Sequence, residues 1–180
     1  SVSAAFAVVN RIDDFAYTPE QNIAHAMTAL MAQNKGAGKI DRMKEGFRCG
    51  IILETIYGIL IFIICFALAR PLMMMFVKDE EVIGHGVTYL HLISVMYLLP
   101  ALTNGIQGFF RGVGDLKITL ISSFINMALR VLAAAPLVFI WKMGIEALPY
   151  SYLAGWIGML VAETPLLLKT YKTWGKKAGQ

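Results

Sequence analysis

Four segments of this 180-residue chain are each long and apolar enough to cross a lipid bilayer. A helix rises 1.5 Å per residue, so roughly 20 residues are needed to span about 30 Å of hydrocarbon. The segments lie approximately at Phe47–Leu68, Gly86–Phe110, Ile118–Trp141 and Ile145–Lys169. Hydrophobic residues make up 57% of the chain and charged residues 16%, a more apolar composition than that of a soluble domain. We therefore predict an all-α membrane protein.

The amino-terminal region supplies a fifth predicted span, at about residues 10–33. Counting back about 20 residues from Gln33 reaches Asp13. The cluster of Arg11, Asp13 and Asp14 should then lie at the outer membrane interface, where we expect these side chains to be solvated or paired with one another.

Lysine and arginine residues gather on one side of the predicted topology. If the five spans alternate, eleven basic residues fall on the side of the carboxyl-terminal tail and three on the other. Because cytoplasmic loops carry the excess of basic residues, we predict a cytoplasmic carboxyl terminus and an outer amino terminus. The positive charge then needs no nucleic-acid partner, and we expect a multi-pass protein of the plasma membrane, in a bacterium the inner membrane. The cytoplasmic set is Lys35, Lys39, Arg42, Lys44, Arg48, Arg111, Lys117, Lys169, Lys172, Lys176 and Lys177, and the outer set is Arg70, Lys78 and Lys142.

Polar residues inside the first span point to a buried cavity. Glu20 falls one to two turns inside the outer boundary and is followed by Asn22 and His25. Ionisable residues within spans usually face a bundle interior or a watery cavity and often serve ion pathways. For His25 a simpler alternative is an interior residue hydrogen-bonded to Gln21 one turn back.

Arg130 lies near the middle of the fourth span, four residues after Asn126 and therefore on the same helix face. An arginine at that depth needs a partner or water. Glu54 and Glu163 are the candidate partners. The group is either an interhelical ion pair that fixes the packing or part of a coupling or substrate pathway.

The third span contains Pro100, which should kink it, and a short polar stripe beyond the kink. Asn104 and Gln107 are three residues apart and share one face among Leu, Ile and Phe residues. They are candidates for the lining of a cavity.

Catalytic motifs are nearly absent from the sequence. It contains no phosphate-binding loop of the G-x-x-x-x-G-K-[ST] type and no histidines or cysteines at metal-ligand spacing, so we predict no metal and no cofactor. The stretch GVGD at Gly112–Asp115 matches the G-x-G-D of intramembrane aspartyl proteases, but those enzymes need a second aspartate in a neighbouring span. Asp115 stands between Arg111 and Lys117, which favours a capping or salt-bridging role. We predict that the chain is not an enzyme.

The order of four short motifs resembles the carboxyl-terminal half of MATE (multidrug and toxin extrusion) transporters. These motifs are AAFAVVNRIDDFAY, ALMAQNKGAGK, FFRGVGDLK and ALRVLAAAPL, and together they cover nearly the whole chain. The resemblance implies that Gly36, Gly38, Gly112 and Gly114 are structural turn positions. It also implies that Arg111 and Asp115 belong to the family's RG-x-GD turn.

The resemblance implies a twelve-helix antiporter of two six-helix lobes that exports cationic or amphipathic compounds in exchange for protons or sodium ions. Residues 1–180 would be part of the second lobe, with lipid, small organic cations or drugs, and the remaining transporter helices as partners. Some branches of the family use an acidic residue in the helix that matches Gly86–Phe110, which has none here. A flippase of related fold for lipid-linked precursors is the alternative.

The resemblance also implies where a site would lie. Glu20, with Asn22 and His25, would face the cavity of the second lobe, and Arg130 matches an arginine of that span. We expect Glu20 and Arg130 to act as electrostatic elements. The predicted cavity lining is Tyr17, Asn104 and Gln107.

Overall fold

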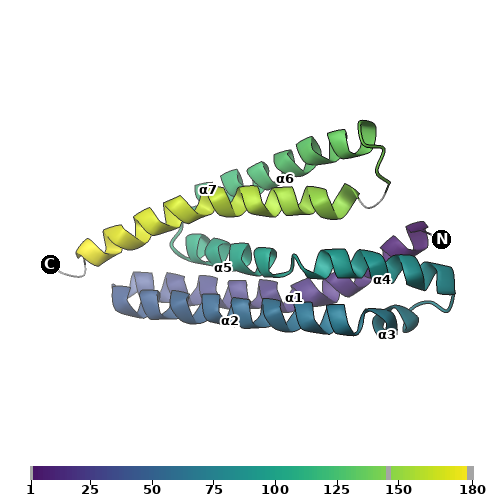
Figure 1. Ribbon diagram of the computed structural model, residues 1–180. Helices are drawn as coiled ribbons and strands as arrows, with labels where there is room; N and C mark the ends of the chain where they lie inside the picture. The colour runs from purple at the N-terminus through teal and green to yellow at the C-terminus, as the bar shows by residue number, and fades with distance from the viewer. Residues whose placement is uncertain (1, 145–146, 178–180) are drawn as a thin grey trace.

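The computed structural model describes residues 2–144 and 147–177, which form seven helices and no strand (Figure 1). The long helices run alternately in opposite directions, and the two ends of the chain lie at opposite ends of the bundle. This confirms the predicted all-α fold. The helices are α1 Val2–Gly36, α2 Ile40–Ala67, α3 Ala69–Met74, α4 Glu80–Ser94, α5 Leu98–Gly112, α6 Leu116–Phe139 and α7 Ala147–Lys177.

Within the described residues, three helices are both long and apolar enough to cross a membrane: Ile40–Ala67, Leu116–Phe139 and Ala147–Thr173. The α4–α5 pair is a fourth if the two helices are counted as one bent span. Helix α1 has 35 residues but does not meet the same criterion, and it carries the charged residues Arg11, Asp13, Asp14 and Glu20. The predicted membrane helices are therefore confirmed in general, and the count of five remains a prediction.

Helices α1, α2 and α5 each contact the other two and form a three-helix group that α4 extends, and an α6–α7 hairpin packs against this group through α5 (Figure 1). One apolar core joins α1 to α4 around Val9, Leu90 and Tyr97. A second core joins α1, α2 and α5 around Met31 and Phe109. Helix α2 turns a row of isoleucines outward, as a lipid-facing helix does. The exposed isoleucines of α2 are Ile52, Ile56, Ile59 and Ile63.

Helices α1 and α5 approach closely because small residues face each other. A Cβ atom added at Gly108 would lie 2.6 Å from the carbonyl oxygen of Ala24, and one added at Gly112 would lie 2.6 Å from that of Thr28. The hydroxyl of Thr28 also donates a hydrogen bond to the carbonyl of Gly108 at 3.0 Å. The spacing of four residues on both helices is the small-xxx-small pattern of close membrane-helix pairs. This contact holds the polar faces of α1 and α5 together.

The predicted third span is two helices rather than one. Helices α4 and α5 meet at an angle of 47°, with the break at residues 95–97. Pro100 lies just after the break, in the first turn of α5. A proline there removes no needed hydrogen bond, because the first N–H groups of a helix have no partner within it. The kink thus precedes the proline.

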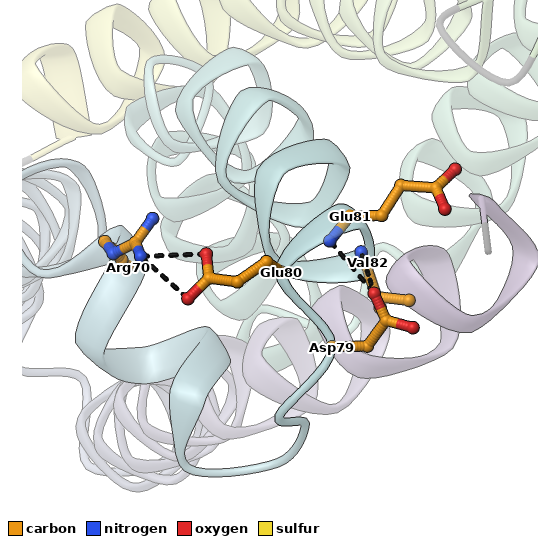
Figure 2. A network of polar contacts seen from close by, with 5 residues as sticks. All are labelled: Arg70, Asp79, Glu80, Glu81 and Val82. Carbon is orange, nitrogen blue, oxygen red and sulfur yellow. Dashed lines mark hydrogen bonds and ion pairs between the residues drawn. The ribbon is translucent and has the colours of Figure 1, made fainter.

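The connection between α2 and α4 contains a further short helix, α3, and a polar network (Figure 2). The guanidinium of Arg70 pairs with both carboxylate oxygens of Glu80, at 3.0 and 2.8 Å. The carboxylate of Asp79 accepts hydrogen bonds from the backbone N–H groups of Glu81 and Val82, at 2.9 and 3.3 Å. Asp79 is therefore the N-cap of α4, as its residue type favours.

The turns at the other end of the bundle agree only in part with the turn positions predicted from the sequence. Gly38 and Gly114 have φ values of +68° and +82°, which glycine adopts at little cost, whereas Gly36 is the last residue of α1. The ammonium of Lys35 donates a hydrogen bond to the carbonyl of Val113, which ties the two turns together. Asp115 is exposed and its side chain forms neither a cap nor a salt bridge with any described residue, so that prediction is wrong. Arg111 lies in the last turn of α5, where a cation is favourable.

Candidate functional site

Two fully buried carboxylic acids lie between α1, α2 and α5. The side chains of Glu20 on α1 and Glu54 on α2 each have 0% exposure. None of their four carboxyl oxygens has a hydrogen-bond partner among the described residues. Glu54 also acts electrostatically on Glu20. Unpaired acids at this depth are costly and mark a functional site more often than a structural one.

Residues of all three helices surround this pair. Asn104 of α5 approaches the carboxyl of Glu20 closely enough to interact with it, although the geometry of a regular hydrogen bond is not reached. Tyr57 of α2 lies within electrostatic reach of both acids, and its hydroxyl donates a hydrogen bond to the carbonyl of Ala16 at 3.0 Å. That bond fixes α1 against α2 one turn before Glu20. The structure thus brings Asn104 to Glu20, as the predicted cavity lining requires.

A second polar group lies between α5, α6 and α7. The amide nitrogen of Gln107 donates to a buried carboxyl oxygen of Glu163 at 3.3 Å and to the hydroxyl of Ser123 at 3.4 Å. The other carboxyl oxygen of Glu163 has no hydrogen-bond partner within the part of the chain that the structure describes. Beside these groups is a pocket of about 160 Å³, whose walls carry hydrogen-bonding side chains and one indole ring. The pocket is lined by Asn104, Gln107, Ser123, Asn126, Trp156 and Met159.

Arg130 does not pair with either acid proposed for it. Its guanidinium lies over the ring of Tyr152 on α7, 3.9 Å from the ring centroid, in a cation–π contact. Gly155 permits this approach, because a Cβ atom there would lie 2.5 Å from Cγ of Arg130. Glu54 and Glu163 point into the two groups described above instead. The alternative of an interhelical ion pair with Glu54 or Glu163 is therefore wrong, and the ring of Tyr152 takes the place of the acid.

The outer cluster also differs from its prediction. Arg11 and Asp14 are exposed, but Asp13 is only 8% exposed and accepts a hydrogen bond from the hydroxyl of Tyr97. Tyr97 lies at the α4–α5 break, and its ring meets that of Tyr17 edge to face at 5.9 Å. The prediction of a solvated or paired surface acid is thus wrong for Asp13. Its carboxylate instead holds the bend between α4 and α5 against α1.

The other predicted site residues are divided between two faces of α1. Tyr17 is half-buried and lies within electrostatic reach of Asp13, Glu20 and Arg130. Asn22 and His25 are exposed, so the structure does not bring them together with Glu20. The alternative of an interior His25 does not fit its exposure. Whether Asn22 and His25 face a cavity stays a prediction.

The sequence prediction treats Glu54 and Glu163 only as partners of Arg130, whereas the structure places each of them in a buried polar group without it. The prediction does not include Trp156 or Tyr152. For Trp156, the sequence does contain one indication. Trp156, Met159 and Glu163 are spaced by three and four residues, which places them on one face of a helix. That face includes the lining of the 160 Å³ pocket.

Comparison with known proteins decides the family. The MatE family model matches residues 2–135, about three quarters of the chain. The chain belongs to the MatE family. Members of this family are transporters rather than enzymes. The prediction that the chain is not an enzyme is therefore confirmed, and the aspartyl protease alternative is wrong.

Curated relatives of this MatE chain are bacterial proteins of greater length. The probable multidrug resistance protein YoeA of Bacillus subtilis is 29% identical over 98% of this chain and 38% of its own length. The probable multidrug resistance protein NorM of Thermotoga maritima is 24% identical over 93% of this chain and 36% of its own length. The chain thus spans little more than a third of these relatives.

Solved MATE structures share the fold. A MATE transporter named ClbM, in complex with Rb⁺, superimposes with a TM-score of 0.86 at 16% identity, covering 95% of this chain and 39% of its own. An inward-facing multidrug resistance MATE transporter gives a TM-score of 0.78 at 16% identity, covering 91% and 36%. The helices described above are therefore arranged as in part of a MATE transporter.

Proposed function

We propose that this chain forms part of a secondary active transporter that exports cationic or amphipathic compounds in exchange for protons or sodium ions. The observation that carries the proposal is Glu20, which is fully buried on a MatE-family helix and has no hydrogen-bond partner among the described residues on either carboxyl oxygen. The curated relatives named multidrug resistance proteins support the class of compound. Because the chain covers little more than a third of those relatives, the remaining transporter helices would be its partners.

The proposed mechanism follows from the cost of burying charge. An ionised carboxylate in a low-dielectric interior is stabilised by any cation that reaches it. A coupling ion and a cationic compound would therefore exclude each other from the negative interior. If rocking of the two lobes exposes that interior to each side of the membrane in turn, movement of the ion down its gradient drives movement of the compound against its own gradient. No ATP is consumed.

The proposed orientation places the amino terminus outside and the carboxyl terminus in the cytoplasm. The α1–α2 connection, the α5–α6 turn and the carboxyl-terminal end of α7 lie at one end of the bundle (Figure 1). The predicted cytoplasmic basic residues belong to these segments. The positive-inside tendency then supports five spans in the plasma membrane with this end inward.

Transport by the full-length parent protein in liposomes tests the proposal. We expect it to move ethidium, an organic cation, against its concentration when a proton or sodium gradient of the correct direction is imposed without ATP. An ionophore that collapses the driving gradient should stop the movement, and separate proton and sodium arms identify the ion. Movement of a lipid-linked precursor without any gradient dependence, together with no ethidium transport, would favour the flippase and contradict the proposal.

A further inference from the structure

A groove lies between α2 and α7, towards the end of the bundle where both helices carry their basic residues (Figure 1). Its volume is about 350 Å³, which is within the range of roughly 300–1,000 Å³ for small-molecule sites. The lining contains one cation, Arg48, and is otherwise apolar or aromatic. The uncharged lining residues are Phe47, Ile51 and Ile52 of α2 and Leu167, Leu168 and Tyr171 of α7.

The floor of the groove is part of the packed interior. Phe47, Ile51 and Leu167 are half-buried and pack against the second core. The ring of Phe47 meets that of Phe109 edge to face, with 4.9 Å between the centroids, and its centroid lies 6.4 Å from that of Tyr171. A groove built on packed side chains keeps its shape without an occupant, which lowers the entropic cost of binding.

The rim of the groove faces the surroundings of the protein. The side chains of Ile52 and Leu168 are 47% and 55% exposed, although both residues belong to helices that are apolar enough to cross a membrane. Ile52 is also the first isoleucine of the outward row on α2. Because such a row is typical of a lipid-facing helix, the groove is continuous with the lipid-facing surface of α2.

The cation of the groove, Arg48, lies nearer the α1–α2 connection than Ile52 does. It is exposed and has neither a hydrogen-bond nor an ion-pair partner among the described residues. Lys44 lies one turn before Arg48 on the same face of α2, and Lys172 lies four residues after Leu168 on α7. Both walls thus change from apolar to cationic in the same direction. A guanidinium matches the geometry of a phosphate, and basic pockets between membrane helices bind anionic headgroups.

We propose that this groove binds one anionic phospholipid, with an acyl chain along the apolar wall and the phosphate on Arg48. A soluble phosphate would leave the apolar wall unused, and a zwitterionic lipid would bring a second cation beside Arg48. In the proposed orientation the lipid belongs to the cytoplasmic leaflet, which contains anionic lipids. This inference goes beyond the proposed function, because it concerns the membrane around the transporter rather than the ion or the compound.

Photolabelling of the full-length parent locates the lipid. The protein is placed in phosphatidylcholine vesicles that contain a minor share of phosphatidylglycerol with a diazirine on its acyl chain. After illumination, the labelled peptides are mapped by mass spectrometry. We expect label on residues 47–52 and 167–171. Unlabelled phosphatidylglycerol should displace the probe, whereas added phosphatidylcholine or glycerol phosphate should not.

Separate variants test the charge and the shape of the groove. Arg48→Gln should reduce its labelling about fivefold, the effect of removing one basic residue near an anionic surface, and Arg48→Lys should restore most of it. Leu168→Trp keeps every charge but fills the groove, so we expect at least the same reduction. The control is Arg42→Gln, because this exposed arginine lies about 120° from Arg48 around α2. It should leave labelling unchanged, and thermal unfolding shows whether each variant is folded.

Several results would overturn the proposal. Equal labelling of the groove in native protein and Arg48→Gln, or by the phosphatidylglycerol probe and a matching phosphatidylcholine probe, would show only the general contact of a membrane helix with lipid. Displacement by glycerol phosphate would assign the site to a soluble anion. Absence of label from both segments would show that another part of the parent protein covers the groove. None of these measurements uses an ion gradient, so each outcome is independent of the proposed function.

Discussion

Alanine in place of Gly108 is expected to lower the free energy of unfolding by about 1–3 kcal/mol. The new Cβ atom would lie 2.6 Å from the carbonyl oxygen of Ala24 and 3.2 Å from its Cα atom, both of which belong to the backbone of α1. Neither can move as a flexible side chain does, so the two helices must separate. Separation also weakens the hydrogen bond from Thr28 to the carbonyl of Gly108. Thermal unfolding of the full-length parent in detergent measures the change.

The matched control is Gly84→Ala on α4. A Cβ atom there meets nothing within 4 Å, and the residue is exposed in the middle of a helix. Alanine should therefore leave stability unchanged or raise it by up to about 1 kcal/mol, the usual helical preference over glycine. Equal effects of the two substitutions would show that the close approach of α1 and α5 does not stabilise the protein.

Removing the carboxylate of Asp13 should destabilise the protein by about 1.5–3 kcal/mol, the range for a hydrogen bond to a charged group. Asp13→Ala leaves the hydroxyl of Tyr97 buried without its acceptor at the α4–α5 break. The neighbouring Asp14→Ala is the control, because Asp14 is exposed and surface substitutions usually change stability by less than about 0.5 kcal/mol. Both are measured by thermal unfolding. A loss for Asp14→Ala as large as that for Asp13→Ala would contradict the assigned role of Asp13.

The helical architecture could be predicted because the length of an apolar segment is a strong indication of a membrane helix. The predicted spans at 47–68 and 118–141 correspond to α2 and α6 within a few residues, apart from the amino-terminal extension of α2 to Ile40. The predicted span at 145–169 corresponds to α7, although residues 145 and 146 lie outside the described residues. The break between α4 and α5 could not be placed, because periodicity within one segment says nothing of the tertiary contact that Tyr97 makes with Asp13 at the break.

The candidate site was predicted less well, because the predicted depth of a residue in the membrane does not identify the side chains that it contacts. Counting 20 residues back from Gln33 placed Asp13 at the surface, but α1 already begins at Val2, and α4 packs against the part of α1 that precedes Asp13. The burial of Glu20 was predicted by the same count and is confirmed. Arg130 was expected to seek an acid, yet α6 and α7 pair in a register that presents Tyr152 to it. Such registers follow from packing across helices, which periodicity within one helix does not determine.

Drug-driven ion flux tests the central claim, that the buried acid of α1 carries the charge used in exchange. The full-length parent is reconstituted in liposomes, ethidium is added on one side, and proton and sodium movement are recorded for native protein and Glu20→Gln. The neutral amide keeps the size of the side chain but cannot hold a cation by charge, so ion flux should fall by at least about tenfold, with the variant still folded. Unchanged flux in Glu20→Gln would contradict the account and show that Glu20 is a packing residue.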